Sequence, residues 1–473
     1  MRQKNSKSLA ILNRNLAVLF CLGLLVGPVR QASAGWEQVP KILSKISPPQ
    51  FPNRDFKITD YGAVGDGQTD CTEAFKKAIS AANKAGGGRV VVPAGTFFSG
   101  PIHLKSNVNL YVSEGAVIKF STDPNAYLPA VYTRWEGIEC MNYSPLIYAY
   151  KQKNIAITGK GILDGQGSYK SWWQWVKNRE DREALVKQGQ AGVPVKQRLY
   201  GGKTLRPNMI EPYKCKNILI EGITIRNGPF WHIHPVLSQN ITIRNVKVEG
   251  LGPNNDGCDP ESCKDVLIKG CYFNTGDDCI AVKAGRNNDG RRVNVPSENI
   301  VIQDCQMKAG HGGVVIGSEM TGGVRNVFAE NCTMDDPNLD RVLRLKTNSL
   351  RGGFIENVYA RNITVGQVKE SILHIYYFYG EGDKGSFVPI VRNINMENVT
   401  SRKSKYALFL KGYERSPMTD IRLKNCTFDN IQDPNLVEIS YVKNLVLENV
   451  KINGKTFNGL AKEQNPAGSA SHD

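Results

Sequence analysis

A short phrase that recurs along the chain constrains the fold more than any other feature of the sequence. Each copy begins with Asn or Asp, followed by Ile, Val or Leu in alternation with other residues. From Asn217 onward, successive copies are 23, 25, 34, 27, 31, 36, 27 and 24 residues apart. Repeats of 20–50 residues are typical of solenoids and propellers. The copies begin at Asn154, Asn217, Asn240, Asp265, Asn299, Asn326, Asn357, Asn393, Asp420 and Asn444.

The content of each repeat selects among these architectures. The units lack apolar residues at i, i+3, i+4 and i+7, which a helical repeat needs. They are also shorter than a four-stranded propeller blade of about 40–45 residues. Units of two or three short strands with insertions of variable length fit an all-β fold, the parallel β-helix. Its successive coils stack about 4.8 Å apart, so residues far apart in sequence meet on one face.

The segments outside the repeat define the expected domain organisation. Residues 35–54 predict an irregular entry segment. Asp70 to Ala85 predicts an amphipathic helix that caps the first open coil. We expect the catalytic β-helix over residues 55–458, with an excursion at residues 166–206. The small, polar residues 459–473 predict a disordered tail.

The excursion contains three of the six tryptophans of the chain, Trp172, Trp173 and Trp175. These side chains are large and apolar with one polar atom, so they suit stacking on sugar rings. Packing of the excursion against the solenoid is an equally good interpretation. The sequence leaves both open.

Residues 1–34 predict a cleaved signal peptide. A basic start precedes an apolar run from Leu16 to Gly27, and Ala32-Ser33-Ala34 offers small residues for cleavage. The apolar run is too short to span a bilayer, and no other segment approaches that length. We therefore expect a secreted or periplasmic protein without stable membrane insertion after cleavage.

Net charge narrows the class of partner. The formal charge is +16, and residues 1–34 hold five basic and no acidic residues, so the remainder carries +11. A basic exported protein is expected to meet a polyanion, and an acidic polysaccharide is the expected partner. No stretch of Lys and Arg is dense enough to predict nucleic-acid binding. Oligomeric state is not predicted.

The cysteines do not predict a metal site. Cys258, Cys263, Cys271 and Cys279 are separated by four, seven and seven residues, without the paired spacing of a zinc site. Export permits disulfides, so the cysteines are expected to be small buried hydrophobes or to form local disulfides. We expect neither a metal nor another cofactor.

Acidic, imidazole and cationic residues recur at intervals close to the repeat length. If these intervals are coil lengths, the side chains form a ladder on one face. The intervals are 22 residues from Asp256 to Asp278, and 33 each from Asp278 to His311, from His311 to Arg344 and from Lys346 to Tyr379.

Three aspartates on such a face suit hydrolysis of a glycosidic bond. One acid protonates the leaving oxygen while another carboxylate activates a water molecule. Asp277 and Asp278 would point to opposite faces of a regular strand, so both reach the site only at a strand end or bend. Gly276 makes such a bend possible. Each aspartate alone is an ordinary turn residue, and only their joint occurrence at the repeat length favours catalysis.

The basic residues point to an acidic sugar. His311 would tune or relay a proton, or hydrogen-bond the sugar. Arg344 and Lys346 suit a substrate carboxylate, Arg344 through its planar guanidinium.

Four ordered motifs carry a resemblance to a known family: Asn254-Asn255-Asp256, Gly276-Asp277-Asp278, Gly310-His311-Gly312 and Arg344-Leu345-Lys346. Over residues 55–450 the chain resembles the polygalacturonase family of glycoside hydrolases, and most of all its bacterial exo-acting members. Asn255 departs from the Asn-Thr-Asp that is usual in the family. The resemblance implies a right-handed parallel β-helix that cleaves pectin.

The resemblance also implies roles for the residues. It implies Asp277 as the general acid, Asp256 and Asp278 as the residues that position and activate water, and inversion at the anomeric carbon. It implies Arg344 and Lys346 as galacturonate binders and Tyr379 as a sugar contact. The excursion and the N-terminal region would close one end of the groove and favour exo action, which the sequence leaves open against endo action.

Three alternatives remain beside hydrolysis of polygalacturonate. The enzyme could hydrolyse rhamnogalacturonan or xylogalacturonan. It could be a calcium-dependent pectate lyase on a similar fold, although the carboxylates and basic residues fit acid hydrolysis better. It could also be a glycan-binding solenoid without activity, although three clustered aspartates suit a polyanion poorly.

Overall fold

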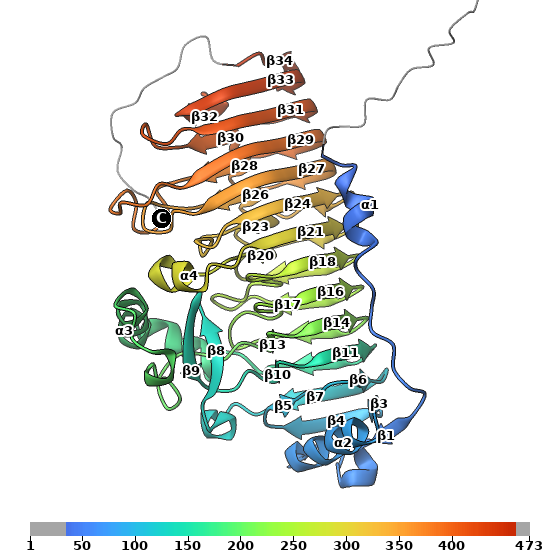
Figure 1. Cartoon of the computed structure of the whole chain (residues 1–473). Coiled ribbons are helices and arrows are strands. Elements are labelled where there is room, and N and C mark those ends of the chain that lie inside the picture. The colour runs from blue at the N-terminus through green and yellow to red at the C-terminus, as the bar shows by residue number, and fades with distance from the viewer. Residues whose placement is uncertain (1–34, 460–473) are drawn as a thin grey trace, which may run out of the picture. The chain divides into compact units, whose positions relative to one another are not determined.

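The protein is a parallel β-helix with an N-terminal capping helix, as the repeat predicts. A computed structural model describes residues 35–459, all within one compact unit that begins at Gly35. Within this unit, successive coils stack so that parallel strands form three faces (Figure 1). The predicted signal peptide and residues 460–473 of the predicted tail lie outside the described residues.

Each face pairs strands of successive coils in parallel. The first face contains β1 (Asp55–Lys57), β3 (Gly88–Val92), β6 (Val108–Val112), β11 (Lys153–Gly159), β14 (Lys216–Glu221), β16 (Gln239–Arg244), β18 (Lys264–Lys269), β21 (Ser297–Gln303), β24 (Val324–Glu330), β27 (Phe354–Gln367), β29 (Ile390–Lys403), β31 (Met418–Phe428) and β33 (Val442–Ile452). The second face contains β2 (Asp66–Asp70), β4 (Gly95–Ser99), β7 (Ala116–Phe120), β12 (Ile162–Asp164), β15 (Thr224–Arg226), β17 (Lys247–Gly250), β19 (Tyr272–Thr275), β22 (Gln306–Met307) and β25 (Thr333–Met334).

The third face positions the candidate site. It contains β5 (Ile102–His103), β10 (Ile147–Tyr150), β13 (Ile210–Tyr213), β20 (Ile280–Val282), β23 (Val314–Ile316), β26 (Arg341–Lys346), β28 (Ser371–Tyr376), β30 (Tyr406–Lys411) and β32 (Val437–Ser440). Isolated bridges at Ile233 and Cys258 connect β13 to β20 across two coils. The short β34 (Lys455–Thr456) pairs antiparallel with β33.

The recurring Asn or Asp has a conformational cause. All ten repeat residues lie at positive φ, for example 58° at Asn326 and 57° at Asn393. Asn and Asp tolerate this left-handed region better than other residues with a side chain. Their side chains also stack from coil to coil: the amide of Asn326 donates to Asn299 at 3.0 Å, and that of Asn393 donates to Asn357 at 2.7 Å. The repeat therefore marks one corner of every coil.

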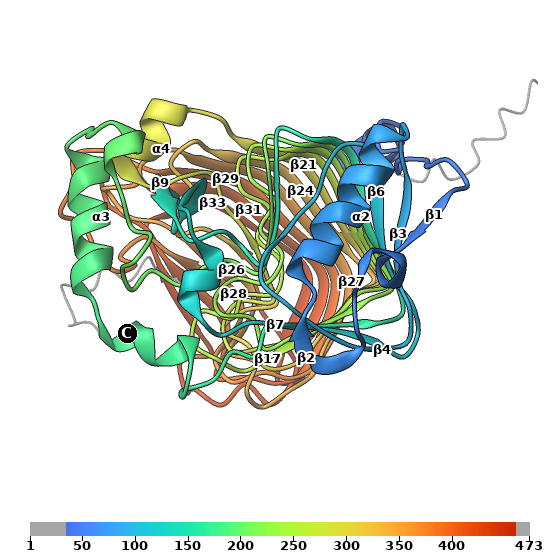
Figure 2. The same ribbon diagram turned by 90° about the horizontal axis from the view of Figure 1, so that it is seen from below.

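Helices and one hairpin surround the coils. The helices are α1 (Gln38–Leu43), α2 (Thr72–Lys84), α3 (Glu180–Gln190) and α4 (Asn287–Val293), with 3-10 turns η1 (Ile58–Tyr61), η2 (Pro124–Tyr127), η3 (Trp172–Lys177) and η4 (Val195–Gln197). The hairpin joins β8 (Val131–Trp135) to β9 (Ile138–Asn142) in antiparallel pairing. Seen from below, α2 lies across the first coils as the predicted cap (Figure 2). The N-cap position is Cys71 rather than the predicted Asp70, but Asp70 still accepts the first N–H of the helix, that of Thr72, at 2.8 Å.

The entry segment is an external strap along the first face. Its α1 lies beside β21 and β24 (Figure 1). There Trp36 packs against Phe328 and Tyr359, with ring centroids 5.5 and 6.2 Å away. Farther along, the Asn240 side chain exchanges two hydrogen bonds with the backbone of Ser47. The strap thereby covers apolar side chains that point outward from the coils.

The excursion contains η3, α3 and η4, and its tryptophans pack inward. Trp172 is buried against Tyr127. Trp173 donates to the Gly228 carbonyl at 3.0 Å, and Trp175 packs half-buried against Tyr143. These contacts favour the packing interpretation over sugar stacking.

The cysteines are buried as expected, without disulfides among the described residues. All ten cysteines of residues 35–459 are free and buried. The helices in this part of the chain are too short or too polar to cross a membrane.

Candidate active site

A cavity of about 440 Å³ opens beside β20, β23 and β26 of the third face. Its lining combines residues of these coils with residues of the hairpin and the excursion and with Arg286, which precedes α4. The lining residues are Glu136, Arg182, Trp231, Asn254, Asp256, Asp277, Asp278, Lys283, Arg286, Ser318, Glu319, Lys346, Arg351, Tyr379, Gly380 and Glu381.

Three predicted aspartates meet in this cavity. One carboxylate oxygen of each of Asp256, Asp277 and Asp278 lies within 4.8 Å of the other two. Asp277 and Asp278 occupy the turn between β19 and β20, so both side chains reach the site from a bend rather than from a regular strand. A Cβ at Gly276 would lie 2.2 Å from the Gly252 carbonyl oxygen, and glycine therefore allows this close approach.

The loop before Asp256 is fixed by buried polar groups. The Asn255 side chain donates to the carbonyls of Gly228 and Phe230, both at 3.0 Å. The Asp256 carbonyl accepts from the backbone and the Nδ1–H of His232, at 3.0 and 2.8 Å. Burial lowers the pKa of His232 to about 4, so this imidazole is neutral and supports the loop.

Asp277 and His311 form the accessible pair of the site. Nδ1 of His311 lies 2.9 Å from Oδ1 of Asp277. The hydrogen bond and charge of Asp277 raise the pKa of His311 to about 9. Burial would raise the pKa of Asp277, but the hydrogen bond and charge of His311 outweigh it and hold that pKa below its usual range. In the free enzyme the shared proton therefore rests on His311.

Asp278 faces the predicted cations. Nζ of Lys346 lies 2.7 Å from Oδ2 of Asp278, and a guanidinium nitrogen of Arg344 lies 3.6 Å from its Oδ1. The Tyr379 ring lies beside both cations, with its centroid 5.2 Å from Nζ of Lys346 and 5.6 Å from the guanidinium carbon of Arg344. Because Arg344 and Lys346 are each 5% exposed, these cations are preorganised within the protein.

Asp256 lies on the floor of the cavity, beside a buried lysine. Its Oδ2 lies 3.4 Å from Nζ of Lys283. Burial raises the pKa of Asp256 well above its usual range, the charges of Asp259 and Asp277 raise it further, and Lys283 opposes the shift.

The pairing of residues on successive coils agrees only in part with the spacings predicted from the sequence. Cys258 pairs with Ile280, so Asp256 and Asp278 are in register at the predicted 22 residues. The later spacing of 33 is not the register: Val315 lies opposite Arg344, and Lys346 lies opposite Tyr376. The prediction of one regular ladder was therefore wrong. His311 and Tyr379 reach the site from loops, because insertions change the length of each coil.

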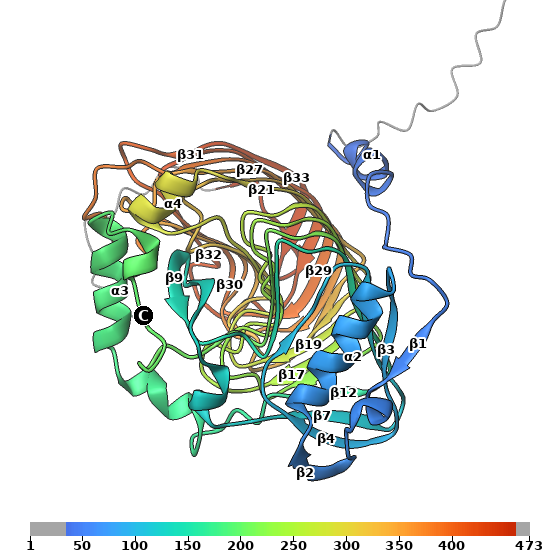
Figure 3. The ribbon, with the colours of Figure 1, turned by 60° about the horizontal axis from the view of Figure 1, so that its bottom comes forward.

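The sequence prediction missed a wall of ion pairs at one end of the cavity. Glu136, in the β8–β9 turn, bonds Arg182 of α3 at 2.8 Å and Arg286 at 2.9 Å. Arg286 and Arg351 both contact Glu381, at 3.1 and 3.4 Å. The hairpin, α3 and α4 lie together on one side of the coils (Figure 3). The two-residue turn ending in Gly137 was the signal that could have predicted the hairpin.

The floor beneath Asp256 was also missed. Lys283 and Asp259 lie near the predicted motifs, but a lysine at a strand end is usually exposed and predicts nothing by itself. Lys283 is covered by the ring of Trp231, which comes from another coil.

Comparisons with known proteins agree with this geometry. Residues 83–446 match the family described as glycosyl hydrolases family 28. A probable polygalacturonase of Vitis vinifera is 32% identical, over 78% of this chain and 73% of the relative. An exo-poly-alpha-D-galacturonosidase of Dickeya chrysanthemi is 29% identical, over 69% of this chain and 57% of the relative.

A solved structure extends the similarity to almost the whole described region. The hyperthermoactive exopolygalacturonase of Thermotoga maritima is 44% identical, with a TM-score of 0.86, covering 89% of this chain and 97% of that chain. The match to the family model spans well over half of the chain and includes all four sequence motifs. The chain therefore belongs to family 28 of the glycosyl hydrolases and is a glycoside hydrolase of the polygalacturonase type.

Proposed function

We propose that the protein hydrolyses α-1,4-galacturonosyl linkages of polygalacturonate or pectin from chain ends, with inversion and without a metal. The observation that carries this proposal is the gathering of Asp256, Asp277 and Asp278 beside Arg344 and Lys346 in one cavity. Carboxylates supply the acid and base of glycoside hydrolysis, and buried cations recognise an acidic sugar.

Asp277 is the proposed general acid. By ionisation alone Asp256 would be the better acid, because its pKa is raised. Access decides for Asp277: its side chain is 18% exposed, against 4% for Asp256 and 1% for Asp278. The imidazolium of His311 passes its proton to Asp277, and Asp277 delivers that proton to the glycosidic oxygen as the bond to the anomeric carbon breaks.

Asp256 and Asp278 are the proposed holders of the attacking water. One of them accepts the proton that the water loses as its oxygen bonds to the anomeric carbon. The closest oxygens of the three aspartates lie within 4.8 Å, which is shorter than the roughly 6.5–9.5 Å usual for an inverting pair. Lys346 and Arg344 neutralise Asp278 and make it a weak nucleophile. This neutralisation and the family resemblance support inversion.

Exo action is supported by the wall and by the exopolygalacturonase relatives. Ion pairs of Glu136 with Arg182 and Arg286 brace one end of the cavity, which limits how far a polymer can extend. A closed end of this kind favours release of small products from a chain terminus. A cleaved signal peptide at residues 1–34 and a catalytic domain at residues 55–458 complete the proposal, with export to the periplasm or the exterior.

The central test measures reducing ends released from polygalacturonate. Wild type should release monogalacturonate or digalacturonate from the start, whereas early oligomers would contradict exo action. Unsaturated products would indicate a lyase instead. Proton NMR of the first product should show the β anomer, and an initial α anomer would refute inversion.

A second experiment separates the acid from the base. Asp277→Asn should lower the rate on polygalacturonate by about 10²–10⁴-fold. On a dinitrophenyl galacturonide, whose leaving group needs no proton, it should retain most of the wild-type rate. Asp256→Asn should fail on both substrates. The reverse pattern would assign the acid to Asp256.

A further inference from the structure

A single ammonium group lies among three carboxylates beneath the cavity. Nζ of Lys283 is 3.4 Å from Oδ2 of Asp256, 3.4 Å from Oδ1 of Asp259 and 3.5 Å from Oε2 of Glu319. The Trp231 ring covers another side, with its centroid 4.3 Å from Nζ. The Lys283 side chain is only 3% exposed. Burying a charge this deeply costs free energy unless opposite charges beside it compensate for the loss of water.

Asp259 is fully buried, and its only polar neighbours among the described residues are Lys283 and Asp256. Neither of its carboxylate oxygens accepts a well-aligned hydrogen bond, and its relative exposure is 0%. Its remaining contacts are the ion pair with Lys283 and the neighbouring carboxyl of Asp256. Burial raises the pKa of Asp259 to about 7. A buried carboxyl group without a well-aligned hydrogen bond is destabilising, so folding alone does not account for it.

We propose that Lys283 and Asp259 are positioning residues that hold the Asp256 carboxylate in place and in its charged form during hydrolysis. This inference rests on the proposed role of Asp256 in holding and activating water. Lys283 supplies the contacting positive charge that favours the ionised form of Asp256 against the effect of burial. Asp259 pairs with the same ammonium from outside the cavity lining and fixes its position beside Asp256.

The charge on Lys283 is secure in this setting. Burial would lower its pKa, but the charges of Asp256, Asp259 and Glu319 outweigh burial and raise it. The ammonium therefore stays protonated across the pH range in which the aspartates titrate. Replacement of Lys283 by a neutral side chain removes a full positive charge from beside Asp256.

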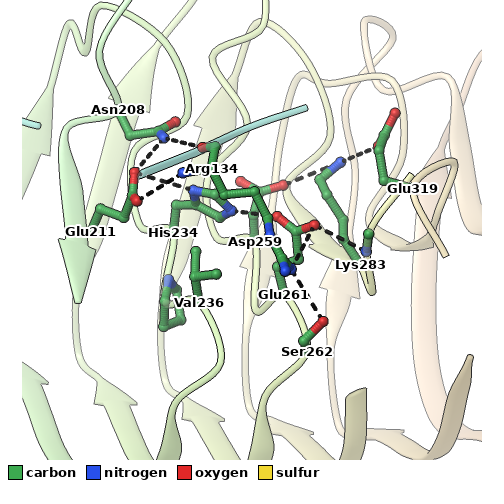
Figure 4. A network of polar contacts seen from close by, with 12 residues as sticks. Arg134, Asn208, Glu211, His234, Val236, Asp259, Glu261, Ser262, Lys283 and Glu319 are labelled. Atoms are coloured by element: carbon green, nitrogen blue, oxygen red, sulfur yellow. Dashed lines mark hydrogen bonds and ion pairs between the residues drawn. The ribbon is translucent and has the colours of Figure 1, made fainter. Parts of the chain in front are cut away.

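A second layer of buried charges fixes this pair in space (Figure 4). Glu261 is bridged to Lys283 on the next coil and accepts the Gly285 N–H at 3.0 Å. Arg134, from β8 of the hairpin, lies 3.3 Å from Glu261, and Nε2 of His234 lies 2.8 Å from it. The segment that carries Asp259 is therefore anchored to the hairpin that walls the cavity.

Other charged groups also face Asp256 and must be considered in any pH profile. Asp277 and Asp278 approach from the turn before β20, and the charges of both raise the pKa of Asp256. Arg206, from the end of the excursion, interacts with Asp256 at longer range while bonding Asn254. Three further groups act through a neighbour: Glu319 through Lys283, His311 through Asp277, and Lys346 through Asp278.

The test compares pH profiles of kcat/KM on polygalacturonate for four variants. Lys283→Met should move the acidic limb to higher pH by about one unit or more, because Asp256 loses its cation. Asp259→Asn should move the same limb to lower pH, because a negative neighbour is lost. Lys283→Arg should stay near wild type. The matched control Lys264→Met removes an exposed, ion-paired lysine of β18 and should leave the profile unchanged.

The opposite directions of the two shifts support the inference, together with a KM that changes much less than kcat. A purely structural role would lower Tm and reduce kcat equally at every pH, with the limbs unmoved, and that result would overturn the inference. If Lys283→Met does not fold, the direction of the Asp259→Asn shift decides. A wild type without hydrolysis would refute the proposed function, and with it the role of Asp256. A normal wild type with unmoved limbs would refute this inference alone.

Discussion

Replacement of Lys346 by methionine tests whether the buried cations hold the site together. Nζ of Lys346 lies 2.7 Å from Asp278, and the two side chains are 6% and 1% exposed. Removing one partner of a buried ion pair costs about 3–5 kcal/mol, because the other charge stays buried without its partner. Arg344 remains 3.6 Å from Asp278, so we expect the lower end, about 3 kcal/mol.

The size of the protein sets the expected change in Tm. Unfolding entropy is about 2.1 cal/mol/K per residue, so the about 425 described residues contribute about 0.9 kcal/mol/K. A loss of about 3 kcal/mol then lowers Tm by about 3 °C. The control Lys264→Met, which breaks an exposed pair with Glu298, should change Tm by less than about 1 °C.

Scanning calorimetry of Lys346→Met, Asp278→Asn and the double variant gives the result. The double variant removes both charges, so its Tm should exceed that of Lys346→Met. If the two single losses simply add in the double variant, the residues are not coupled and the reasoning is refuted.

Five further outcomes are expected. The kcat/KM should fall as pH rises through about 9, where His311 loses its proton, and His311→Gln should lack this limb in a pH–rate profile. Since the pKa of His311 is raised on folding, its stabilising contribution is complete below about pH 6.5 and is lost through about pH 9, which Tm measured against pH checks. Asn357→Ala should lower the free energy of unfolding by about 2–4 kcal/mol through a strained positive φ and two lost ladder bonds, and Asn357→Gly should recover part of it in thermal melts. Gly137→Val should displace Arg286, whose Cβ would lie 2.8 Å from the new Cβ, and shift products toward oligomers in chromatography; an unchanged product pattern would exclude the hairpin as the cause of exo action. Chelator should leave the rate unchanged, because the three aspartates already contact cations of the chain, and loss of activity would contradict a metal-free mechanism.

The fold was predictable because one backbone requirement recurs in every coil. One residue at the same corner of each coil must adopt a left-handed conformation, and Asn and Asp adopt it at the lowest cost in free energy among residues with a side chain. The sequence therefore shows Asn or Asp at a regular interval. The in-register spacing of Asp256 and Asp278 was predictable for the same reason.

The rest of the site depends on contacts that no local pattern specifies. Lys283 is buried beneath the ring of Trp231, which comes from another coil. Tyr379 lies in a loop whose length hides its true register from the sequence. The resemblance to the family, and not the spacing, implied that Tyr379 contacts the sugar.

The strap has a consequence for the order of folding. Trp36 is made near the start of the chain, but Tyr359, against which it packs, follows 323 residues later. Its docking surface also needs Phe328 of the neighbouring coil, so α1 can seat only after the coils through β27 have formed. Such a late, long-range contact slows completion of the native state, since a large loop must close first. Once α1 is packed in place, the coils that it contacts cannot separate one at a time until Trp36 leaves Phe328 and Tyr359.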